Sequence, residues 1–217
     1  DDFKAYRNSV AGGSYNAKVY DIDQLIDQFA FGIKKHPSSI RNFIQYTLAN
    51  YTARPKLVFL IGKGVNYASY RSLESHPNAT IQTDLERLNL VPTFGNPASD
   101  NLLSCFQQNN IPAVPIGRLS VVNADEVAIY LKKVKDYEVS QAFSSPYIAD
   151  KAWIKNIIHV VGADNGDLQK VLNQLMDNYK AIISDTLFGG SVNTFSKTST
   201  ETAEQINSQR LQNLFQE

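Results

Sequence analysis

The sequence has a single cysteine, Cys105, and no excess of charge of either sign. One cysteine excludes an internal disulfide, and low cysteine use fits the cytosol as well as many secreted bacterial proteins. Lysine plus arginine number 21, as do aspartate plus glutamate, so the formal net charge is zero. This balance gives no electrostatic basis for binding nucleic acid or an anionic membrane surface, and no nucleic-acid partner is predicted.

Long hydrophobic runs are also missing. No apolar stretch approaches the roughly 20 residues that a spanning helix needs, so no membrane insertion is expected. No signal peptide is visible and the chain begins with Asp1 rather than Met, which suggests a processed or excised piece of a longer protein. With 217 residues, 43% of them hydrophobic, the chain is long enough for one large domain or two small ones.

Short apolar runs alternate with amphipathic patterns, which is typical of an α/β protein. Residues 57–61 form an apolar run closed by Gly62, and residues 156–161 form a second run closed by Gly162. Their length and bulk predict strands that are buried in parallel sheets. Apolar residues at helical spacing predict helices over 22–29, 37–48, 123–138, 168–179 and 198–215.

The remaining segments are predicted from weaker signals. Residues 65–90 are polar and irregular, which predicts a surface loop. Short strands are expected at 102–103, 113–116 and 191–195. Residues 139–152 contain Ser, Ala and one Pro, and they are interpreted as a linker between two strand–loop–helix blocks.

Two loops follow the buried strands, at the position where open α/β sheets bind their ligands. In Gly62-Lys63-Gly64, the backbone could approach a phosphate closely and Lys63 could supply a counter-charge. The spacing of a Walker loop or of a dinucleotide-binding loop is missing. A tight turn is therefore the simpler interpretation of this loop, and a small-ligand site is the alternative.

The second loop places an acid, Asp164, between a buried strand and a helix. A carboxylate at that position can cap the helix and interact favourably with its dipole, which is the structural interpretation. The functional interpretation is a carboxylate that orients a catalytic imidazole, as the third member of a nucleophile–base–orienter arrangement. The residues alone leave both interpretations open.

A cysteine nucleophile needs a nearby imidazole base. Cys105 lies among apolar residues and is interpreted as a small core hydrophobe. His36 and His76 each precede a proline, and His159 lies inside an apolar strand, where a core histidine with satisfied hydrogen bonds is expected. None of the three forms a recognisable pair with Cys105, and no cluster has zinc-ligand spacing.

One run of oxygen-bearing side chains, Ser99-Asp100-Asn101, suits a hard cation such as calcium. Three residues do not make a site. No cofactor is therefore predicted, and calcium stays an open candidate.

Several short motifs follow one another in an order that is less ordinary. Ser99-Asp100 is followed by Ile116-Gly117-Arg118, then by Tyr137-Glu138 at the end of a predicted helix, and Trp153 opens the second half. In this order and spacing the chain resembles the gingipain-like cysteine peptidases, a family that includes the sortase of the type IX secretion system.

The resemblance extends over nearly the whole chain. Residues 26–32 resemble the family's acid-Phe-Ser-x-Gly segment, and residues 37–43 resemble its Ile-Arg-x-Phe helix. Residues 57–62 resemble the strand usually written Leu-Leu-Val-Gly-Asp, with Lys63 in place of the common acid.

The resemblance implies a caspase-like α/β fold, with two side-by-side subdomains whose mainly parallel sheets are flanked by helices. Residues 1–145 would form the first subdomain, and residues 146–217 the beginning of the second, catalytic one, which would be incomplete. The family's catalytic histidine and cysteine would both lie beyond Glu217, so the fragment by itself is expected to be inactive.

The resemblance also implies two site residues. In gingipains, an acid after the first strand of the second subdomain hydrogen-bonds the catalytic histidine, and the matching position is Asp164. A second family acid lines the pocket for a basic side chain, and its nearest match is Asp167. An ordinary acid in the first turn of a helix is the structural alternative for Asp167.

The predicted function is part of a gingipain-type cysteine endopeptidase or of a sortase-like transpeptidase. The resemblance implies peptide or protein substrates, the remainder of the parent chain as a partner, and a place outside a bacterium or on its outer-membrane surface. The alternative function is a non-catalytic caspase-like α/β module for interaction or small-ligand binding.

Overall fold

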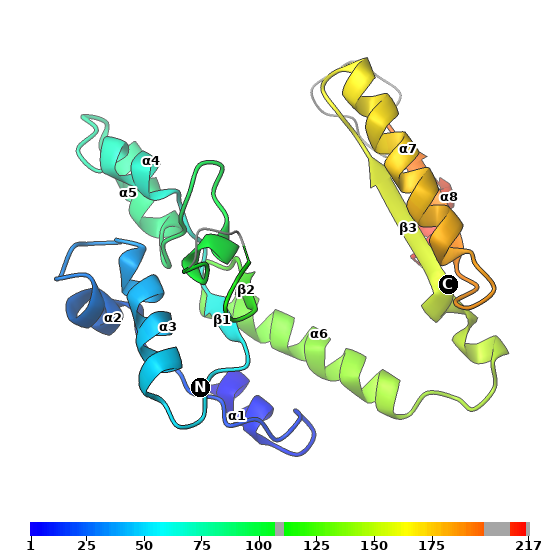
Figure 1. The fold of residues 1–217 in the computed structure, drawn as a ribbon, viewed down its shortest axis with the longest axis horizontal. Helices are drawn as coiled ribbons and strands as arrows, with labels where there is room; N and C mark the ends of the chain where they lie inside the picture. The colour runs from blue at the N-terminus through cyan, green and yellow to red at the C-terminus, as the bar shows by residue number, and fades with distance from the viewer. Residues whose placement is uncertain (107–110, 198–208, 216–217) are drawn as a thin grey trace. The chain divides into compact units, whose positions relative to one another are not determined.

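The computed structural model of the protein describes residues 1–106, 111–197 and 209–215. These residues form a mixed α/β structure with two small parallel sheets that are flanked by helices (Figure 1). The α/β class and the parallel strand pairing predicted from the sequence are confirmed, and the architecture is consistent with a partial caspase-like fold. By their internal contacts the residues form two compact units, Asp1–Val139 and Ser140–Glu217.

The sheet of the first unit consists of β1 (Val58–Ile61) and β2 (Ile116–Leu119), paired in parallel. The predicted strand at 113–116 thus begins later, because Pro115 has no N–H to donate to a neighbouring strand; its carbonyl instead accepts from the Val58 N–H. The core beside this sheet is a cluster of buried apolar residues: Ile40, Ile44, Leu60, Val91, Leu103 and Val114.

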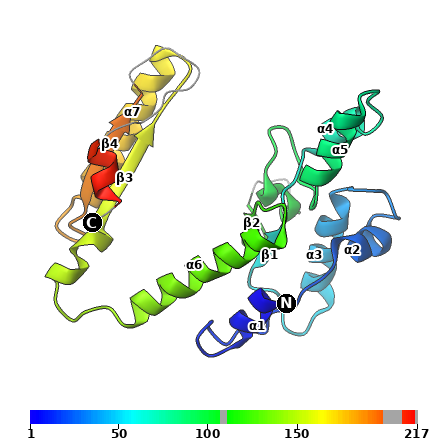
Figure 2. The same ribbon diagram turned by 180° about the vertical axis from the view of Figure 1, so that it is seen from behind.

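Six helices belong wholly or mainly to the first unit: α1 (Asp2–Asn8), α2 (Ile22–Phe29), α3 (Ser38–Asn50), α4 (Tyr67–Leu73), α5 (Ala79–Leu88) and α6 (Ala124–Ala142). Helices α2 and α3 pack side by side, as Figures 1 and 2 both show. The predicted helices at 22–29 and 37–48 are confirmed, and the one at 123–138 extends to residue 142.

The surface loop predicted for residues 65–90 is wrong, because this segment contains α4 and α5. Each helix begins at an asparagine cap: the Asn66 side chain accepts hydrogen bonds from two backbone N–H groups, and the Asn78 side chain accepts one. Tyr70 and Leu85 anchor the two helices as buried residues. The helices are polar and short, so the caps were the stronger sequence signal.

The strand predicted at 102–103 is also wrong. Asp100–Leu103 form a short 3₁₀ helix, η1, which turns the chain back toward the core. Leu103 is completely buried in this helix, and its neighbour Ser104 exchanges hydrogen bonds with the Val114 backbone at 2.8 and 2.9 Å. A two-residue apolar pair does not distinguish a strand from a turn of helix, and here packing decides.

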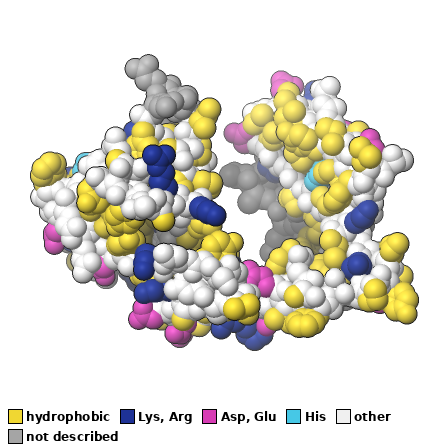
Figure 3. Space-filling view, turned by 60° about the horizontal axis from the view of Figure 1, so that its bottom comes forward, with side chains coloured by type: hydrophobic (Ala, Val, Ile, Leu, Met, Phe, Trp, Pro, Cys, Tyr) yellow, Lys and Arg dark blue, Asp and Glu magenta, His cyan; other side chains and the backbone are white. Residues whose placement is uncertain are grey.

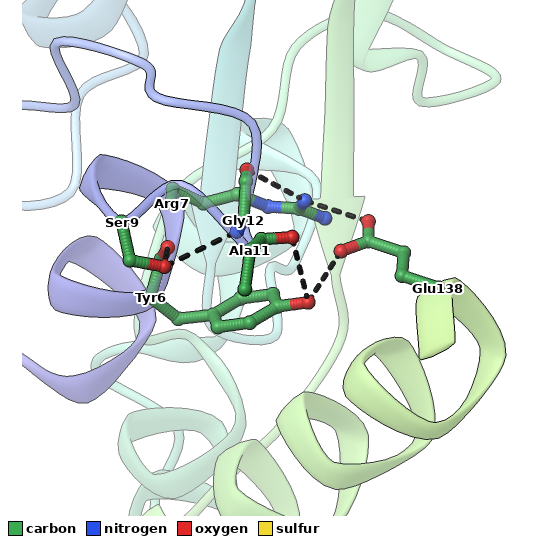
Figure 4. A network of polar contacts seen from close by, with 6 residues as sticks. All are labelled: Tyr6, Arg7, Ser9, Ala11, Gly12 and Glu138. Atoms are coloured by element: carbon green, nitrogen blue, oxygen red, sulfur yellow. Dashed lines mark hydrogen bonds and ion pairs between the residues drawn. The ribbon is translucent and has the colours of Figure 1, made fainter. Parts of the chain in front are cut away.

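Helix α1 is fastened to the first unit at its two ends. The Phe3 ring packs against Phe59 of β1 and Tyr130 of α6. The Tyr6 hydroxyl and the Arg7 guanidinium donate to the two oxygens of Glu138, at 2.6 and 2.7 Å (Figure 4). These hydrogen bonds, that of Tyr6 first, lower the pKa of the Glu138 carboxyl.

The second unit has β3 (Asn156–Val161) paired in parallel with β4 (Ser191–Ser196), and the strands predicted there are confirmed. The predicted helix at 168–179 is α7 (Gly166–Ile183). A 3₁₀ helix, η2 (Ala149–Lys155), precedes β3, so only residues 143–148 of the predicted linker are irregular. Helix α8 (Gln209–Leu214) lies within the predicted helix at 198–215, of which residues 198–208 fall outside the described part of the chain.

The two units differ in how much apolar surface they bury. Among the described residues of the second unit, Val161 is the one large hydrophobic residue that is buried. Helix α7 keeps a stripe of apolar side chains exposed: Leu168, Val171, Leu175, Tyr179 and Ile182. Apolar side chains are visible on the surface of both units in Figure 3. The second unit therefore has the thinner core of the two.

Candidate functional site

The carboxyl end of the first sheet is filled by a side chain of the protein itself. Arg118, in β2, donates two hydrogen bonds of 2.8 Å to the two oxygens of Asp100. Its remaining donors reach the carbonyls of Gly62 (2.7 Å), Val91 (2.8 Å) and Pro92 (3.1 Å). One guanidinium thus joins the end of β1, the segment after α5 and the start of η1. Such a bidentate pair with additional carbonyl partners is a strong and geometrically specific contact.

This pair is largely withdrawn from solvent, with side-chain exposures of 11% for Arg118 and 22% for Asp100. Burial by itself would raise the pKa of the Asp100 carboxyl. The hydrogen bonds and charge of Arg118, together with a hydrogen bond from Thr93, outweigh that effect and hold the pKa below its ordinary value. Asp100 is therefore an ionised structural partner, and both of its oxygens are already occupied by a cation.

The Gly62-Lys63-Gly64 loop is closely packed against the same arginine. A Cβ atom on Gly64 would lie 2.4 Å from the Val91 carbonyl oxygen and 3.0 Å from the Arg118 guanidinium. The glycine is required because backbone and guanidinium approach it so closely. This packing favours the tight-turn interpretation and weighs against the small-ligand alternative, since the space next to the loop is taken.

The carboxyl end of the second sheet is open by comparison. Strand β3 ends at Val161, and the following loop carries Asp164 with an exposed side chain. A Cβ atom on Gly166 would meet no atom within 4 Å. An acid therefore stands in solvent at the edge where α/β sheets present their functional groups.

The helix cap assigned to Asp164 by the structural interpretation is wrong. The N-cap of α7 is Asn165, whose side-chain oxygen accepts from the Leu168 N–H at 2.8 Å. The amide of Asn165 also donates to Asp164 Oδ1 at 3.0 Å. The capping requirement is met by the neighbour, because an asparagine at this position offers both an acceptor for the helix and a donor for the carboxylate.

Asp167 lies in the first turn of α7, a position that fits both the pocket role implied by the resemblance and the structural alternative. Its side chain is 98% exposed and lies 3.5 Å from the Lys170 ammonium. An exposed pair of this kind contributes little to stability. The structure thus brings Asp164 and Asp167 to the same loop and helix start, three residues apart and both in solvent.

Lys197, which the sequence analysis did not identify, follows β4 and contacts this loop. Its backbone N–H donates to the Val161 carbonyl at 2.8 Å, one position beyond the last residue of β4. Its ammonium donates to the Ala163 carbonyl at 3.0 Å. The sequence around Lys197 does not reveal this contact, because it depends on the register of β3 and β4.

Cys105 is buried, as its apolar surroundings predicted. Its thiol donates to the Asn101 carbonyl at 3.0 Å. His36 and His76 each accept a backbone hydrogen bond at Nδ1, from Ser38 and Asn78. None of the described contacts of Cys105 is to a histidine, so this thiol lacks the imidazole base that a catalytic cysteine uses.

His159 is buried as predicted, with 9% of its surface exposed, but one of its two ring nitrogens lacks a hydrogen-bond partner. Nδ1 has no partner, and neither has the hydroxyl of Thr194, which lies beside His159 in the register of β4. Both amide atoms of Gln169 in α7 are likewise buried without a partner. Buried polar groups of this kind are rare, and they mark the thin core of the second unit.

The open calcium candidate at residues 99–101 has lost its main ligand, since both Asp100 oxygens bind Arg118. Across residues 1–106, 111–197 and 209–215, no three acidic, histidine or cysteine side chains gather in a way that could hold a metal ion. The helices in the same part of the chain are all too short or too polar to cross a membrane.

Comparison with known proteins identifies a family for this chain. The sequence model of peptidase family C25 matches residues 1–217. No curated protein and no solved structure gives a match.

Proposed function

We propose, from the premise that this chain belongs to peptidase family C25, that it forms the amino-terminal part of a cysteine peptidase's catalytic domain. Asp164 is then the residue that orients the catalytic imidazole. The observation that carries the proposal is the exposed Asp164 at the carboxyl end of β3, held by Asn165. Members of a peptidase family act on peptides or proteins, so the substrate class follows from the family.

The chemistry of such an enzyme assigns Asp164 a definite task. A thiolate attacks the peptide carbonyl carbon, the carbon–nitrogen bond breaks, and the imidazolium gives its proton to the leaving amine. Water then hydrolyses the thioester in a protease, whereas an amine takes its place in a sortase. A carboxylate beside the imidazole fixes its tautomer and stabilises its charged form. One oxygen of Asp164 accepts from Asn165, and the other can accept from a histidine.

The nucleophile and the histidine are assigned to chain beyond residue 217. This part of the proposal is supported by the contacts of Cys105, whose buried thiol hydrogen-bonds a backbone carbonyl. It is further supported by His36 and His76, which are engaged in turns of the first unit. Residues 1–145 then form a first subdomain, and residues 146–217 begin the catalytic subdomain.

The first test compares this chain with the complete parent protein. The 217-residue chain should hydrolyse no peptide in a mixed fluorogenic library, and alkylation of Cys105 should change nothing. The parent protein should cleave the library and lose activity on alkylation. Peptide cleavage by the 217-residue chain that disappears in Cys105→Ala would contradict the assignment. An inactive parent protein would favour the non-catalytic interaction module.

The second test is Asp164→Asn in the complete parent protein. We expect kcat to fall about a hundredfold or more, because the imidazole loses the carboxylate that orients it. Asp177→Asn is the matched control, since this acid lies in α7 and is also exposed. If both variants keep the kcat of the unmodified enzyme, Asp164 has no catalytic task.

Asp167 is proposed to line the pocket for a basic substrate side chain. In Asp167→Asn, KM for substrates with arginine or lysine before the cleaved bond should rise, because the paired charge is lost. Substrates with an apolar residue at that position should be affected less. An equal change for both substrate types would assign Asp167 to the helix start alone.

The cellular setting belongs to the same proposal. We place the complete protein outside a bacterium or at its outer-membrane surface, as a protease or as a sortase of type IX secretion. Adding a primary amine to the reaction separates the two activities. A sortase would yield substrate joined to the amine, whereas a protease would yield the hydrolysed product.

A further inference from the structure

The loop that carries Asp164 is fixed on two sides by side chains. After Asp164, the Asn165 side-chain oxygen accepts from the Leu168 N–H and so joins the loop to α7, and the Asn165 amide donates to the Asp164 carboxylate. Before Asp164, the Lys197 ammonium donates to the carbonyl of the preceding residue, Ala163. The acid therefore stands between two anchors that come from different elements.

The contact between Lys197 and Ala163 depends on the parallel pairing of β3 and β4. The last ladder pair is Val161 with Ser196, so Lys197 follows β4 at the same edge at which the loop leaves β3. The Lys197 N–H donates to the Val161 carbonyl at 2.8 Å and fixes the backbone of this lysine. Its side chain then passes Gly162, where an added Cβ would lie 3.8 Å from Lys197 Cβ, before reaching Ala163.

A hydrogen bond from an ammonium to a carbonyl is stronger than one between neutral groups. Lys197 is half-buried, which shields this contact from water more than an exposed pair would be. Within the described part of the chain, the Asp164 carboxylate accepts one hydrogen bond, from its sequence neighbour Asn165. Its position is therefore set by the loop backbone, and the Lys197 contact restrains that backbone one residue away.

We propose that Lys197 is a positioning residue, which holds the Ala163 carbonyl so that Asp164 meets the catalytic imidazole in the productive orientation. This inference rests on the proposed function of Asp164. Lys197 touches neither substrate nor histidine in this scheme, and it acts on the reaction only through the loop. A displacement of about 1 Å at an orienting group is enough to reduce the rate substantially.

Amide hydrogen exchange on the 217-residue chain tests the anchor without requiring activity. In Lys197→Met, exchange of the amides of residues 197 and 168, which donate to Val161 and Asn165, should become about tenfold faster, because the charge-assisted hydrogen bond that restrains the loop is lost. Lys197→Arg keeps a cationic donor and should restore most of the protection. Lys180→Met removes an exposed lysine of α7 and should leave the loop unchanged. Unchanged exchange in Lys197→Met would overturn the inference.

Kinetics of the complete parent protein test the consequence. Lys197→Met should lower kcat about tenfold or more with little change in KM, because orientation of the imidazole is impaired rather than substrate binding. The effect should largely disappear in an Asp164→Asn background, since the positioned group is then missing. A purely structural lysine would lower the melting temperature and leave kcat unchanged.

The two proposals fail in different ways. An unimpaired Asp164→Asn enzyme refutes the orienting role of the acid. An impaired Asp164→Asn enzyme together with an unimpaired Lys197→Met enzyme refutes only the positioning role of the lysine.

Discussion

The two sheets end in opposite ways at the edge where α/β proteins present functional groups. At the end of β1 and β2, Arg118 binds the carboxylate of Asp100 and three backbone carbonyls, and the loop packs against it without space for an added Cβ. At the end of β3 and β4, the Asp164 side chain is exposed to solvent, and among the described residues its hydrogen-bond partner is the adjacent Asn165.

This difference separates a structural carboxylate from a functional candidate. Asp100 has a pKa below its ordinary value and no unused oxygen, so it contributes to stability. Asp164 has an oxygen available and little packing around it, which is the condition for interacting with another group. The same local architecture, a short parallel pair followed by a loop, is used once to close a core and once to present an acid.

The largest expected effect comes from removing the guanidinium at the first sheet end. Arg118→Met leaves the Asp100 carboxylate and three carbonyls without their donor in a mostly buried site, which should cost about 3–5 kcal/mol of unfolding free energy. Urea unfolding followed by circular dichroism measures the loss. Arg87→Met is the matched control, because the Arg87 side chain is 59% exposed in its pair with Asp84, and it should cost less than about 1 kcal/mol. Equal losses of unfolding free energy in the two variants would contradict a larger stabilising contribution from the buried Arg118 network.

Asp100→Asn and Asp164→Asn make the same substitution at the two sheet ends, and the larger loss of stability is expected at Asp100. Asp100→Asn should lower the unfolding free energy by about 2–3 kcal/mol, because Arg118 keeps its charge and loses a bidentate partner. The folded-state pKa of Asp100 is lowered, so its stabilisation is complete above the ordinary carboxyl pKa and is lost as the pH falls through the lowered value. The difference between wild type and variant should therefore shrink under acidic conditions. A difference that does not depend on pH would contradict the ionised state of Asp100.

Two glycines sharpen the comparison at the level of packing. Gly64→Ala should lower the unfolding free energy by about 1–3 kcal/mol, because the new Cβ collides with the Val91 carbonyl, a backbone atom that cannot swing aside. Gly166→Ala meets no atom and begins a helix, so it should be neutral or stabilise by up to about 1 kcal/mol. Trp153 is the only tryptophan and lies in the second unit, so its fluorescence reports on that unit separately. Similar effects at the two glycines would remove the distinction between a filled and an open end.

The smallest expected effect on stability is that of Asp164→Asn, within about 0.5 kcal/mol, because the side chain is exposed and does not cap α7. Thermal unfolding of the 217-residue chain measures it. Asn165→Ala should cost more, about 1 kcal/mol, since it removes the N-cap. A larger loss in Asp164→Asn than in Asn165→Ala would make Asp164 a structural residue like Asp100.

Several features of the fold could be predicted because they depend on local signals. The apolar runs at 57–61 and 156–161 are the strands β1 and β3, and the strand at 191–195 is β4. The spacing of apolar residues in 168–179 gave α7. Errors arose where the pattern was weak: the polar helices α4 and α5, and the 3₁₀ turn at 100–103. In those segments the conformation is decided by a helix cap or by a single buried residue. The periodicity of hydrophobic residues reveals neither of these.

For the candidate site, the sequence placed Asp164 and Asp167 on one loop and helix start, and it placed Cys105 in the core. It could not identify the partner of any charged residue. Arg118 and Asp100 are 18 positions apart, and Lys197 and Ala163 are 34 apart. Pairings over such distances depend on which strands are neighbours and in which register, and that is a property of the whole fold.

The sequence by itself determined the α/β class, the positions of the strands and the loops that follow them, because apolar period and glycine placement act locally. Only the tertiary structure decided which of the two acids, Asp100 or Asp164, is available for chemistry. The difference depends on side chains that are distant in the sequence. At one sheet end, the Arg118 guanidinium donates to both oxygens of Asp100 and covers it. At the other end, a lysine that binds only the backbone leaves the acid in solvent.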